Sequence, residues 1–403
     1  MIEFDDKAAQ LGTNIKIIGV GGAGGNAINA MIRNNLYGVE FIAANTDGSD
    51  LTKSCANMKL QIGKKLTRGL GTGANPDVGS RSAEESKDEI KSHLDGADMV
   101  FIAAGMGGGT GTGAAPVIAK IAREMGILTL GIVTSPFPFE GKKRAENADQ
   151  GIRNLREYVD TLIVIPNEKL SEIYSGITLE EAFNKADNIL FEAAKAVSDV
   201  INVTGFMNVD FADVKSVMQN MGYALMGSGM GEGADRAINA ARAAIDNPLL
   251  RDLNLQGCQS MLINITAGHD ILMNEFVEVS NVIVNETGKA GNIITGVILD
   301  DNMAGKINVT LIATGLDREE KGKLIDFPGL TMHTTQTQTH TTAQTQTTAP
   351  VLEKTAEDEM ADILLRLNIN QPAAKEESKL AADEPNRIPS LRTDVPSFLK
   401  ALD

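Results

Sequence analysis

Seven consecutive residues of only glycine and threonine, at 107–113, constrain this chain more than any other stretch. The apolar run before them, 98–104, is typical of a strand covered on both faces, and the apolar spacing over 114–125 indicates a helix. Glycines let the main chain approach a ligand closely, and a helix start favours negative charge. The run therefore predicts a phosphate-binding loop, with a tight turn or linker as the alternative. It lacks the lysine of a GxxxxGK[ST] loop, which excludes the most common class of nucleotide triphosphatase.

Length and charge narrow the class of protein. The 403 residues suffice for two folded domains and a tail, because single cores stop growing at roughly 250 to 300 residues. The net charge of -16 repels nucleic acid and anionic lipid, so we expect no nucleic-acid partner and no direct membrane binding. The amino terminus lacks the order of a secretory signal, and no apolar run approaches the roughly 18 residues that span a bilayer. These features predict a cytoplasmic protein.

Strand and helix patterns alternate between residues 15 and 165, and each strand pattern is apolar rather than alternating. Strands are expected over 15–20, 39–44, 99–104, 127–133 and 162–165, with helices from about Asn26 and over 80–94. This predicts an α/β fold with a doubly wound parallel sheet. A long central helix is expected over 179–201, because Thr178 and Glu181 form a capping box at its start. A smaller α+β unit with a mixed sheet is expected from about 222 to 315, with strands over 258–266, 292–299 and 307–313 and helices near 234–245 and 272–284.

The carboxy-terminal part has a different composition. Residues 331–350 are nearly all Thr, Gln, His and Ala, which cannot bury enough apolar area to fold. We therefore expect a disordered tail. An apolar cluster at 395–400 ends the chain and is typical of segments that fold on a partner.

A second glycine pattern follows the first predicted strand. Gly19, Gly21 and Gly24 form G-x-G-x-x-G, which by itself fits a nicotinamide-dependent dehydrogenase with Asp47 as the ribose ligand. The run at 107–113 argues against that function, because a dinucleotide pyrophosphate needs one helix terminus whereas a triphosphate can use two. The two loops together favour a nucleoside triphosphate.

The run GGGTGTG after a parallel strand resembles the signature of the tubulin superfamily. With Ala-Ala-Gly-Met before it and Ala-Ala-Pro after it, the segment resembles the bacterial FtsZ family of cell-division proteins. The resemblance covers about residues 12–316 and the terminal peptide. It implies a GTPase that binds GTP or GDP, with Mg²⁺ bridging the β- and γ-phosphates, and that polymerises head to tail to scaffold the division ring at mid-cell. A nicotinamide-dependent oxidoreductase and a non-hydrolysing nucleotide-binding scaffold are the alternatives.

The resemblance also implies which residues bind the nucleotide. Glu140, Arg144 and Asn167 would lie along the ribose, and Phe183 would stack on a purine. Asp187 would accept the N1–H and N2–H of guanine, which adenine does not present, and would thereby select GTP. Spacing alone predicts that Glu140 and Arg144 form a surface ion pair. It also predicts that Phe183 is a core residue and that Asp187 is solvated. The phosphates would lie against Gly21, Gly22, Ala23, Gly24, Gly25, Asn26, Gly73, Gly107, Gly108, Gly109, Thr110 and Gly111, with Gly73 in a glycine turn that matches a family loop near the terminal phosphate.

A further segment carries the implied catalytic residues Asn208, Asp210 and Asp213. Its spacing predicts only an N-capped helix with acids in the first turn. In the family the matching loop faces the nucleotide of the next subunit. Asp210 and Asp213 would then polarise or deprotonate the attacking water, and Asn208 would orient it. Hydrolysis would thus require head-to-tail stacking, a contact that does not close and so yields a filament.

The resemblance finally implies a division of the chain into seven parts. These are a flexible amino terminus (1–12), a GTP-binding α/β domain (13–177), the central helix (178–203), a catalytic-loop segment (204–221), a carboxy-terminal α+β domain (222–318), a disordered linker (319–385) and a partner-binding peptide (386–403). The last peptide would bind membrane-tethering and regulatory proteins of the division ring.

Overall fold

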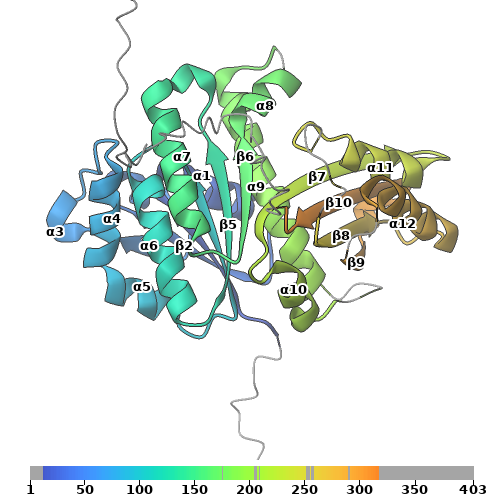
Figure 1. Cartoon of the computed structure of the whole chain (residues 1–403), viewed down its shortest axis with the longest axis horizontal. Coiled ribbons are helices and arrows are strands. Elements are labelled where there is room, and N and C mark those ends of the chain that lie inside the picture. The colour runs from blue at the N-terminus through green and yellow to red at the C-terminus, as the bar shows by residue number, and fades with distance from the viewer. Residues whose placement is uncertain are drawn as a thin grey trace, which may run out of the picture. The chain divides into compact units, whose positions relative to one another are not determined.

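The computed structural model describes residues 12–174, 176–203, 207, 209–250, 255, 258–288 and 291–316. The strands within these residues are β1 (Ile15–Val20), β2 (Val39–Asn45), β3 (Met58–Gln61), β4 (Met99–Gly105), β5 (Leu128–Ser135), β6 (Thr161–Pro166), β7 (Gly222–Glu232), β8 (Ser260–Ala267), β9 (Asn292–Leu299) and β10 (Lys306–Thr314). They form one sheet in the order β3-β2-β1-β4-β5-β6-β7-β10-β8-β9 (Figure 1).

The first six strands are all parallel to their neighbours. The chain builds outward from β1 to β3, then returns and builds from β4 to β6, so the strand order reverses between β1 and β4. Ile15 pairs with Val39 on one side and with Met99 on the other. This order is that of a doubly wound sheet. The predicted fold class is confirmed.

The α-helices within the described residues are α1 (Gly21–Arg33), α2 (Gly48–Thr52), α3 (Lys64–Thr67), α4 (Pro76–Glu85), α5 (Lys87–Leu94), α6 (Thr110–Glu124), α7 (Lys142–Arg156), α8 (Asn167–Ile173), α9 (Leu179–Asn202), α10 (Phe211–Met218), α11 (Arg236–Ile245) and α12 (Met273–Thr287).

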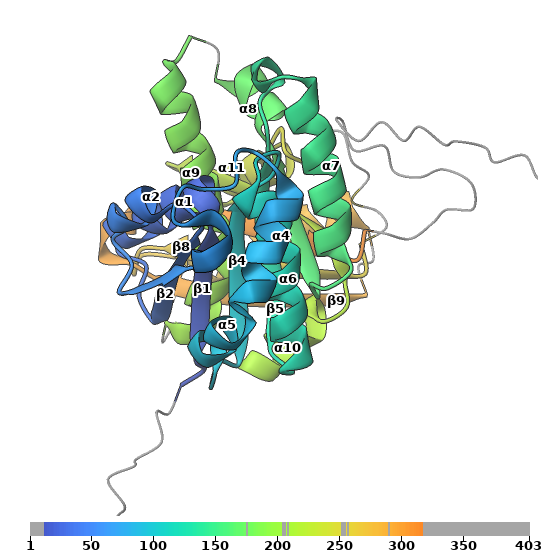
Figure 2. The ribbon, with the colours of Figure 1, turned by 90° about the vertical axis from the view of Figure 1, so that its left-hand side faces the viewer.

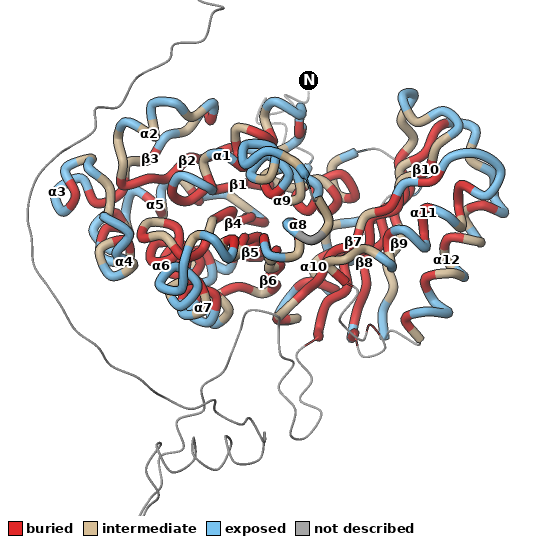
Figure 3. The backbone as a smooth tube through the Cα atoms, turned by 90° about the horizontal axis from the view of Figure 1, so that it is seen from above, coloured by how far each residue is buried: buried red, intermediate tan, exposed pale blue. Residues whose placement is uncertain are grey.

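Helices cover both faces of this parallel half. α1 and α9 pack on one face over a core that includes Ile17 and Phe101, whereas α5, α6 and α7 pack on the other over Ile18 and Ile102 (Figure 2). Seen from above, the strands are buried and the outer helix faces are exposed (Figure 3). No helix of the described residues has the length and hydropathy to cross a membrane.

The remaining four strands continue the same sheet. Thr161 of β6 lies opposite Gly222 of β7 in a short parallel pairing, β10 is antiparallel to both β7 and β8, and β9 is parallel to β8. α11 and α12 cover one face, and α9 covers the other, where Leu262 and Ile312 join the core of the parallel half. The expected mixed sheet is therefore an extension of the first one.

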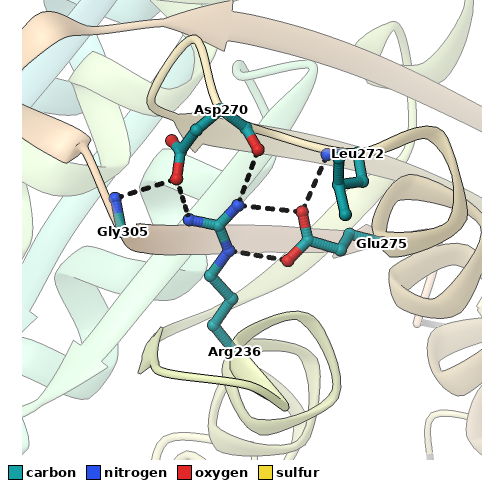
Figure 4. A network of polar contacts seen from close by, with 5 residues as sticks. All are labelled: Arg236, Asp270, Leu272, Glu275 and Gly305. Carbon is teal, nitrogen blue, oxygen red and sulfur yellow. Dashed lines mark hydrogen bonds and ion pairs between the residues drawn. The ribbon is translucent and has the colours of Figure 1, made fainter.

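A buried ion-pair network holds three loops of this extension together (Figure 4). Arg236, 6% exposed, donates from Nε and Nη2 to the Glu275 carboxylate at 2.6 and 2.9 Å. It also donates to the Asp270 side chain and main-chain oxygen, and Gly305 N–H donates to the same carboxylate. Glu275 in turn accepts from Leu272 N–H and so caps α12. These bonds lower the pKa of both carboxyl groups and raise that of the guanidinium.

Candidate functional site

The two glycine loops meet where the strand order reverses. β1 leads into α1 and β4 leads into α6, and these helices lie on opposite faces of the sheet. A Cβ added to Gly21 would lie 3.0 Å from Gly111 N and 3.3 Å from Thr110 Cβ. In open α/β sheets, ligands bind outside the carboxyl ends of the strands at such a point. Two helix amino termini converge here, which favours an anion.

The glycines of the two loops fall into two groups. A Cβ at Gly24 would lie 2.4 Å from Ala103 O, and one at Gly111 would lie 2.6 Å from Gly105 O, so these two positions are required by close packing. An added Cβ at Gly25 or Gly108 would have no atom of the described chain within 4 Å. Gly25 and Gly108 therefore border open space that a ligand can enter.

Gly107 has its backbone groups engaged within the chain. Its N–H donates to Thr112 Oγ1 at 2.9 Å, and its carbonyl accepts from Asn147 Nδ2 at 3.5 Å. Its φ of +101° lies in the region that favours glycine. Gly107 thus fixes the shape of the loop, and Gly108 and Gly109 follow with their N–H groups at the start of α6.

Three threonine hydroxyls join the surrounding loops. Thr110 Oγ1, at the start of α6, lies 2.7 Å from Thr46 Oγ1 and 3.5 Å from Thr72 Oγ1. Thr46 follows β2, and Thr72 lies in the turn that contains Gly73. The sequence reasoning missed Thr46, and it included Thr72 only as part of the glycine turn at 71–76. The available signal was position, because Thr46 directly follows a strand that ends at the same edge as β1.

Two carboxylates border the glycine loops. Asp47 caps α2 by accepting from Ser49 N and Asp50 N through Oδ1, and its Oδ2 would lie 3.7 Å from a Cβ on Gly71. Asp50 Oδ2 would lie 3.2 Å from a Cβ on Gly22. Acidic oxygens therefore stand beside the predicted phosphate loops.

The predicted ribose residues lie at the same edge. Glu140 forms an ion pair with Arg144 and accepts from Phe137 N–H at 2.9 Å. Asn167 directly follows β6 and is 4% exposed, and its Oδ1 has no hydrogen-bond partner among the described residues. Leaving a buried acceptor unpaired is costly. A ligand hydroxyl would satisfy it.

The predicted base-binding residues lie on α9. Phe183 is 42% exposed and meets Phe137 edge to face at 5.2 Å between ring centroids, so part of its ring is available for stacking. Burial raises the pKa of Asp187 to about 7, and the nearby Arg33 opposes this. Two N–H donors would stabilise the ionised carboxylate at this position.

Asp210 and Asp213 lie at the other edge of the sheet. Asn202, which ends α9, donates to Gly38 O just before β2 begins, and Met218, which ends α10, accepts from Thr161 Oγ1 where β6 begins. Asp210 and Asp213, which come between these contacts in the chain, therefore lie at the amino ends of the parallel strands. Figure 2 shows α10 at the end opposite α8. The structure does not bring the predicted catalytic and nucleotide-binding residues together within one chain.

The local structure around Asp210 is the N-capped helix that the spacing predicts. Asp210 Oδ1 accepts from Asp213 N at 2.9 Å, and both side chains are exposed. The Asp213 carboxylate has no hydrogen-bond partner in the part of the chain that the structure describes. Asn208 lies outside the described residues.

Comparisons with known proteins agree with this geometry. Residues 14–175 match the model of the Tubulin/FtsZ family, GTPase domain, and residues 222–317 match the FtsZ family, C-terminal domain. The cell division protein FtsZ of Pseudomonas aeruginosa is 52% identical over 329 residues, which are 81% of this chain and 83% of that protein. The chain belongs to the FtsZ family.

Further FtsZ relatives match over similar lengths. The cell division protein FtsZ of Buchnera aphidicola from Schizaphis graminum is 52% identical over 307 residues, 76% of this chain and 80% of that protein. The empty FtsZ dimer of M. jannaschii has a TM-score of 0.74 at 41% identity and covers 79% of this chain and 96% of that chain.

Family membership confirms the predicted recognition and activity. This FtsZ-family chain is a cytoskeletal GTPase of cell division that binds GTP and GDP. The alternative of a nicotinamide-dependent oxidoreductase has no support in these comparisons.

Proposed function

We propose that the chain binds GTP at the carboxyl edge of its parallel sheet and hydrolyses it when the amino edge of a second copy covers that site. The observation that carries this proposal is the separation of the two residue sets. α9 has 24 residues and is therefore about 36 Å long, and the predicted base-binding residues lie in its first half. Asp210 and Asp213 come after its other end, so they act on the nucleotide of a neighbour.

Head-to-tail contact of this kind joins two different surfaces and repeats without closing, which gives a filament. Exposed apolar side chains stand at the carboxyl edge, with Leu70 84%, Phe139 63% and Leu179 60% exposed. Met207, 42% exposed, stands just before α10. Burying such side chains in a contact between copies is favourable. The M. jannaschii relative with a similar fold is a dimer.

Each nucleotide moiety has a set of residues at the carboxyl edge. The phosphates lie against the N–H groups of the two glycine loops, where Gly25 and Gly108 leave room. The ribose lies along the Glu140–Arg144 pair and satisfies the unpaired Asn167 oxygen. Phe183 and Asp187 bind the guanine. This role accounts for the Asp187 carboxylate on a half-buried face of α9.

The residues beside the phosphate loops fit Mg²⁺. This ion keeps several waters and takes one or two carboxylates together with phosphate oxygens. Asp47 and Asp50 place carboxylate oxygens next to Gly71 and Gly22, and when bound the ion would neutralise charge on the β- and γ-phosphates. These two residues would hold it directly or through water.

The amino-edge residues have separable roles in the reaction. Asp213 has an exposed carboxylate that is not engaged within the described chain, so it activates the attacking water. Asp210 uses one oxygen to cap α10 and places Asp213 on the first turn. Asn208 would orient the water. Asp210 and Asp213 do not reach a phosphate until a second copy stacks on the first.

We also propose the seven-part division stated above, with the peptide at 386–403 binding membrane-tethering and regulatory proteins at mid-cell. The apolar cluster at 395–400 supports this proposal. A chain ending at Asn386 should still sediment as polymer with GTP, while a fluorescent fusion of it should fail to collect at the division site. Normal collection of the fusion would contradict the role of the peptide.

Mixing two defective variants tests the shared site. A Cβ on Gly108 has no atom of the described chain within 4 Å, so Gly108→Val should fill the phosphate space, and Asp213→Ala removes the water-activating carboxylate. Each variant alone should release phosphate at a small fraction of the normal rate. In a mixture, the intact nucleotide site of the Asp213→Ala protein meets the intact amino edge of the Gly108→Val protein, so turnover should recover.

Two controls accompany this mixture. A double variant carrying both changes, added to either single variant at the same total concentration, should restore less turnover, because it supplies no second intact half. Specific activity of the normal protein should also rise with concentration. No recovery in the mixture together with constant specific activity on dilution would contradict the proposal.

A further inference from the structure

Thr46 is a fully buried threonine whose hydroxyl contacts the first residue of α6. It is 0% exposed, and its Oγ1 lies 2.7 Å from Oγ1 of Thr110. Its carbonyl accepts from Thr67 Oγ1 at 3.1 Å and from Gly71 N at 3.3 Å. The main chain is thus fixed by two neighbours. Among the described residues, Thr110 is the partner of the Thr46 hydroxyl.

The chemistry of two hydroxyls decides which one donates. Each has one hydrogen to donate and lone pairs with which to accept. If Thr46 donates to Thr110, the hydrogen of Thr110 is free for a phosphate oxygen. The reverse arrangement would spend that hydrogen inside the protein. Because Thr46 is buried beside no other acceptor in the described part of the chain, donation to Thr110 satisfies it best.

The position of this pair indicates which phosphate it serves. Thr72 Oγ1 lies 3.5 Å from Thr110 Oγ1, and a Cβ on Gly109 would lie 2.0 Å from Thr72 Oγ1. The turn that carries Thr72 is therefore packed directly on the start of α6. The proposed ribose residues follow β5 and β6, whereas Thr46 follows β2 and Thr72 follows β3, on the other side of the two glycine loops. The threonine pair therefore lies at the end of the phosphate site that is away from the ribose.

We propose that Thr46 is a positioning residue that turns the Thr110 hydroxyl toward the terminal phosphate and so helps the site distinguish GTP from GDP. The inference rests on the proposed nucleotide site. Thr46 itself does not contact the nucleotide. Its effect passes through a single hydrogen bond to Thr110, which makes the prediction specific to the hydroxyl rather than to the volume of the side chain.

The test measures binding of fluorescent GTP and GDP analogues to dilute protein. Thr46→Val keeps the shape but removes the donor, and should weaken GTP binding by about tenfold while changing GDP binding by less than about threefold. Thr46→Ser keeps the hydroxyl and should restore the ratio of the two affinities. Thr129→Val is the matched control, because Thr129 is also 0% exposed and donates to a carbonyl, Ile127 O, away from the site. It should lower the melting temperature similarly and leave the ratio unchanged.

Thr110→Val and the double variant separate the inference from the site on which it rests. If Thr110→Val leaves both affinities unchanged, the proposed role of Thr110 at the phosphates is wrong. If Thr110→Val weakens GTP binding but Thr46→Val does not, or if Thr46→Ser fails to restore it, the inference about Thr46 alone is overturned. The double variant should bind like Thr110→Val, because both changes remove one interaction. A further tenfold loss would show that Thr46 acts by another route.

Discussion

The two edges of the parallel sheet are built from different chemistry. The carboxyl edge consists of glycine backbone, helix amino termini and threonine hydroxyls, with Asn167 and Asp187 buried or half-buried behind them. The amino edge around α10 presents two exposed carboxylates on one capped turn. The first edge suits an anion, and the second carries the carboxylates that we propose activate a water molecule.

This difference explains how activity is tied to assembly. A carboxylate free to activate water beside the phosphates of its own chain would allow hydrolysis in the free subunit. Asp47 and Asp50 lie beside the phosphate loops, but Asp47 caps α2 and Asp50 accepts from Asn45 Nδ2. Placing the proposed catalytic acids at the far edge delays hydrolysis until a second copy arrives. The separation depends on the rigidity of α9, which connects the two edges and is packed in the core along much of its length.

Removing the carboxylate of Asp213 should have the largest effect. Asp213→Ala should keep GTP affinity and lower turnover by about 100-fold or more, because a positioned general base contributes about that factor. Asp210→Asn is measured beside it. Because Asn caps a helix as well as Asp does, this change removes the charge of Asp210 and keeps the cap of α10. Phosphate release and nucleotide affinity are measured on both. Normal turnover in Asp213→Ala would contradict the catalytic role proposed for the amino edge.

The two kinds of glycine at the carboxyl edge should respond oppositely. Gly111→Val pushes a side chain into Gly105 O and should lower the free energy of unfolding by about 3 kcal/mol. A Cβ on Gly108 meets no atom within 4 Å, so Gly108→Val should change stability little while blocking GTP. Denaturant unfolding and nucleotide binding together test this. Equal destabilisation by both changes would contradict the assignment of Gly108 to the ligand.

Much of this arrangement follows from the sequence, and the misses have physical causes. β1 lies where its apolar run predicted it, because a strand buried on both faces is apolar rather than alternating. β9 also has its predicted bounds, although it ends the sheet and is only partly buried. α6 begins at Thr110 rather than at 114, and α1 begins at Gly21 rather than near Asn26. Glycine is a poor helix former, so its low propensity concealed first turns that close packing requires.

β7 was missed for a related reason. A Cβ at Gly227, Gly229 or Gly231 would lie within 2.3 Å of backbone atoms of α11. These glycines let a helix lie directly on a strand, but in the sequence they are typical of a turn or loop.

The single helix expected over 80–94 is two helices that meet at Ser86.

The candidate site was predictable only where a motif marked it. The glycine runs identified the phosphate loops, whereas the assignments of Asn167, Phe183 and Asp187 came from the family resemblance. The Thr46–Thr110 contact joins residues 64 positions apart, and nothing in the local pattern of either residue points to the other. Such contacts depend on the strand order.

Protonation of Asp187 should make GTP binding depend on pH. Its pKa is about 7 in the empty protein and 3.8 in the unfolded reference, so the folded form loses stability as pH rises from 3.8 to 7. Guanine favours the ionised form, so GTP binding should release protons and weaken by about tenfold for each pH unit below 7. Asp187→Asn should abolish this dependence. Titration calorimetry in buffers of different ionisation enthalpy measures the released protons, and a flat pH profile would contradict the guanine assignment.

The smallest effect is expected at the Glu140–Arg144 pair, where a structural and a functional role can be separated. The pair lies at the surface, with side-chain exposures of 14% and 51%, and such pairs contribute about 0.5 kcal/mol to stability. Glu140→Gln should therefore change the melting temperature only slightly. If Glu140 also binds the ribose, GTP and GDP affinities should both fall by about threefold, because both nucleotides carry the same sugar. Lys142→Gln is the control, since the Lys142–Glu146 pair is equally spaced on α7 but more exposed. Equal affinities in the two variants would leave Glu140 with a structural role and confine the carboxyl-edge site to its backbone, Asn167 and the base-binding residues of α9.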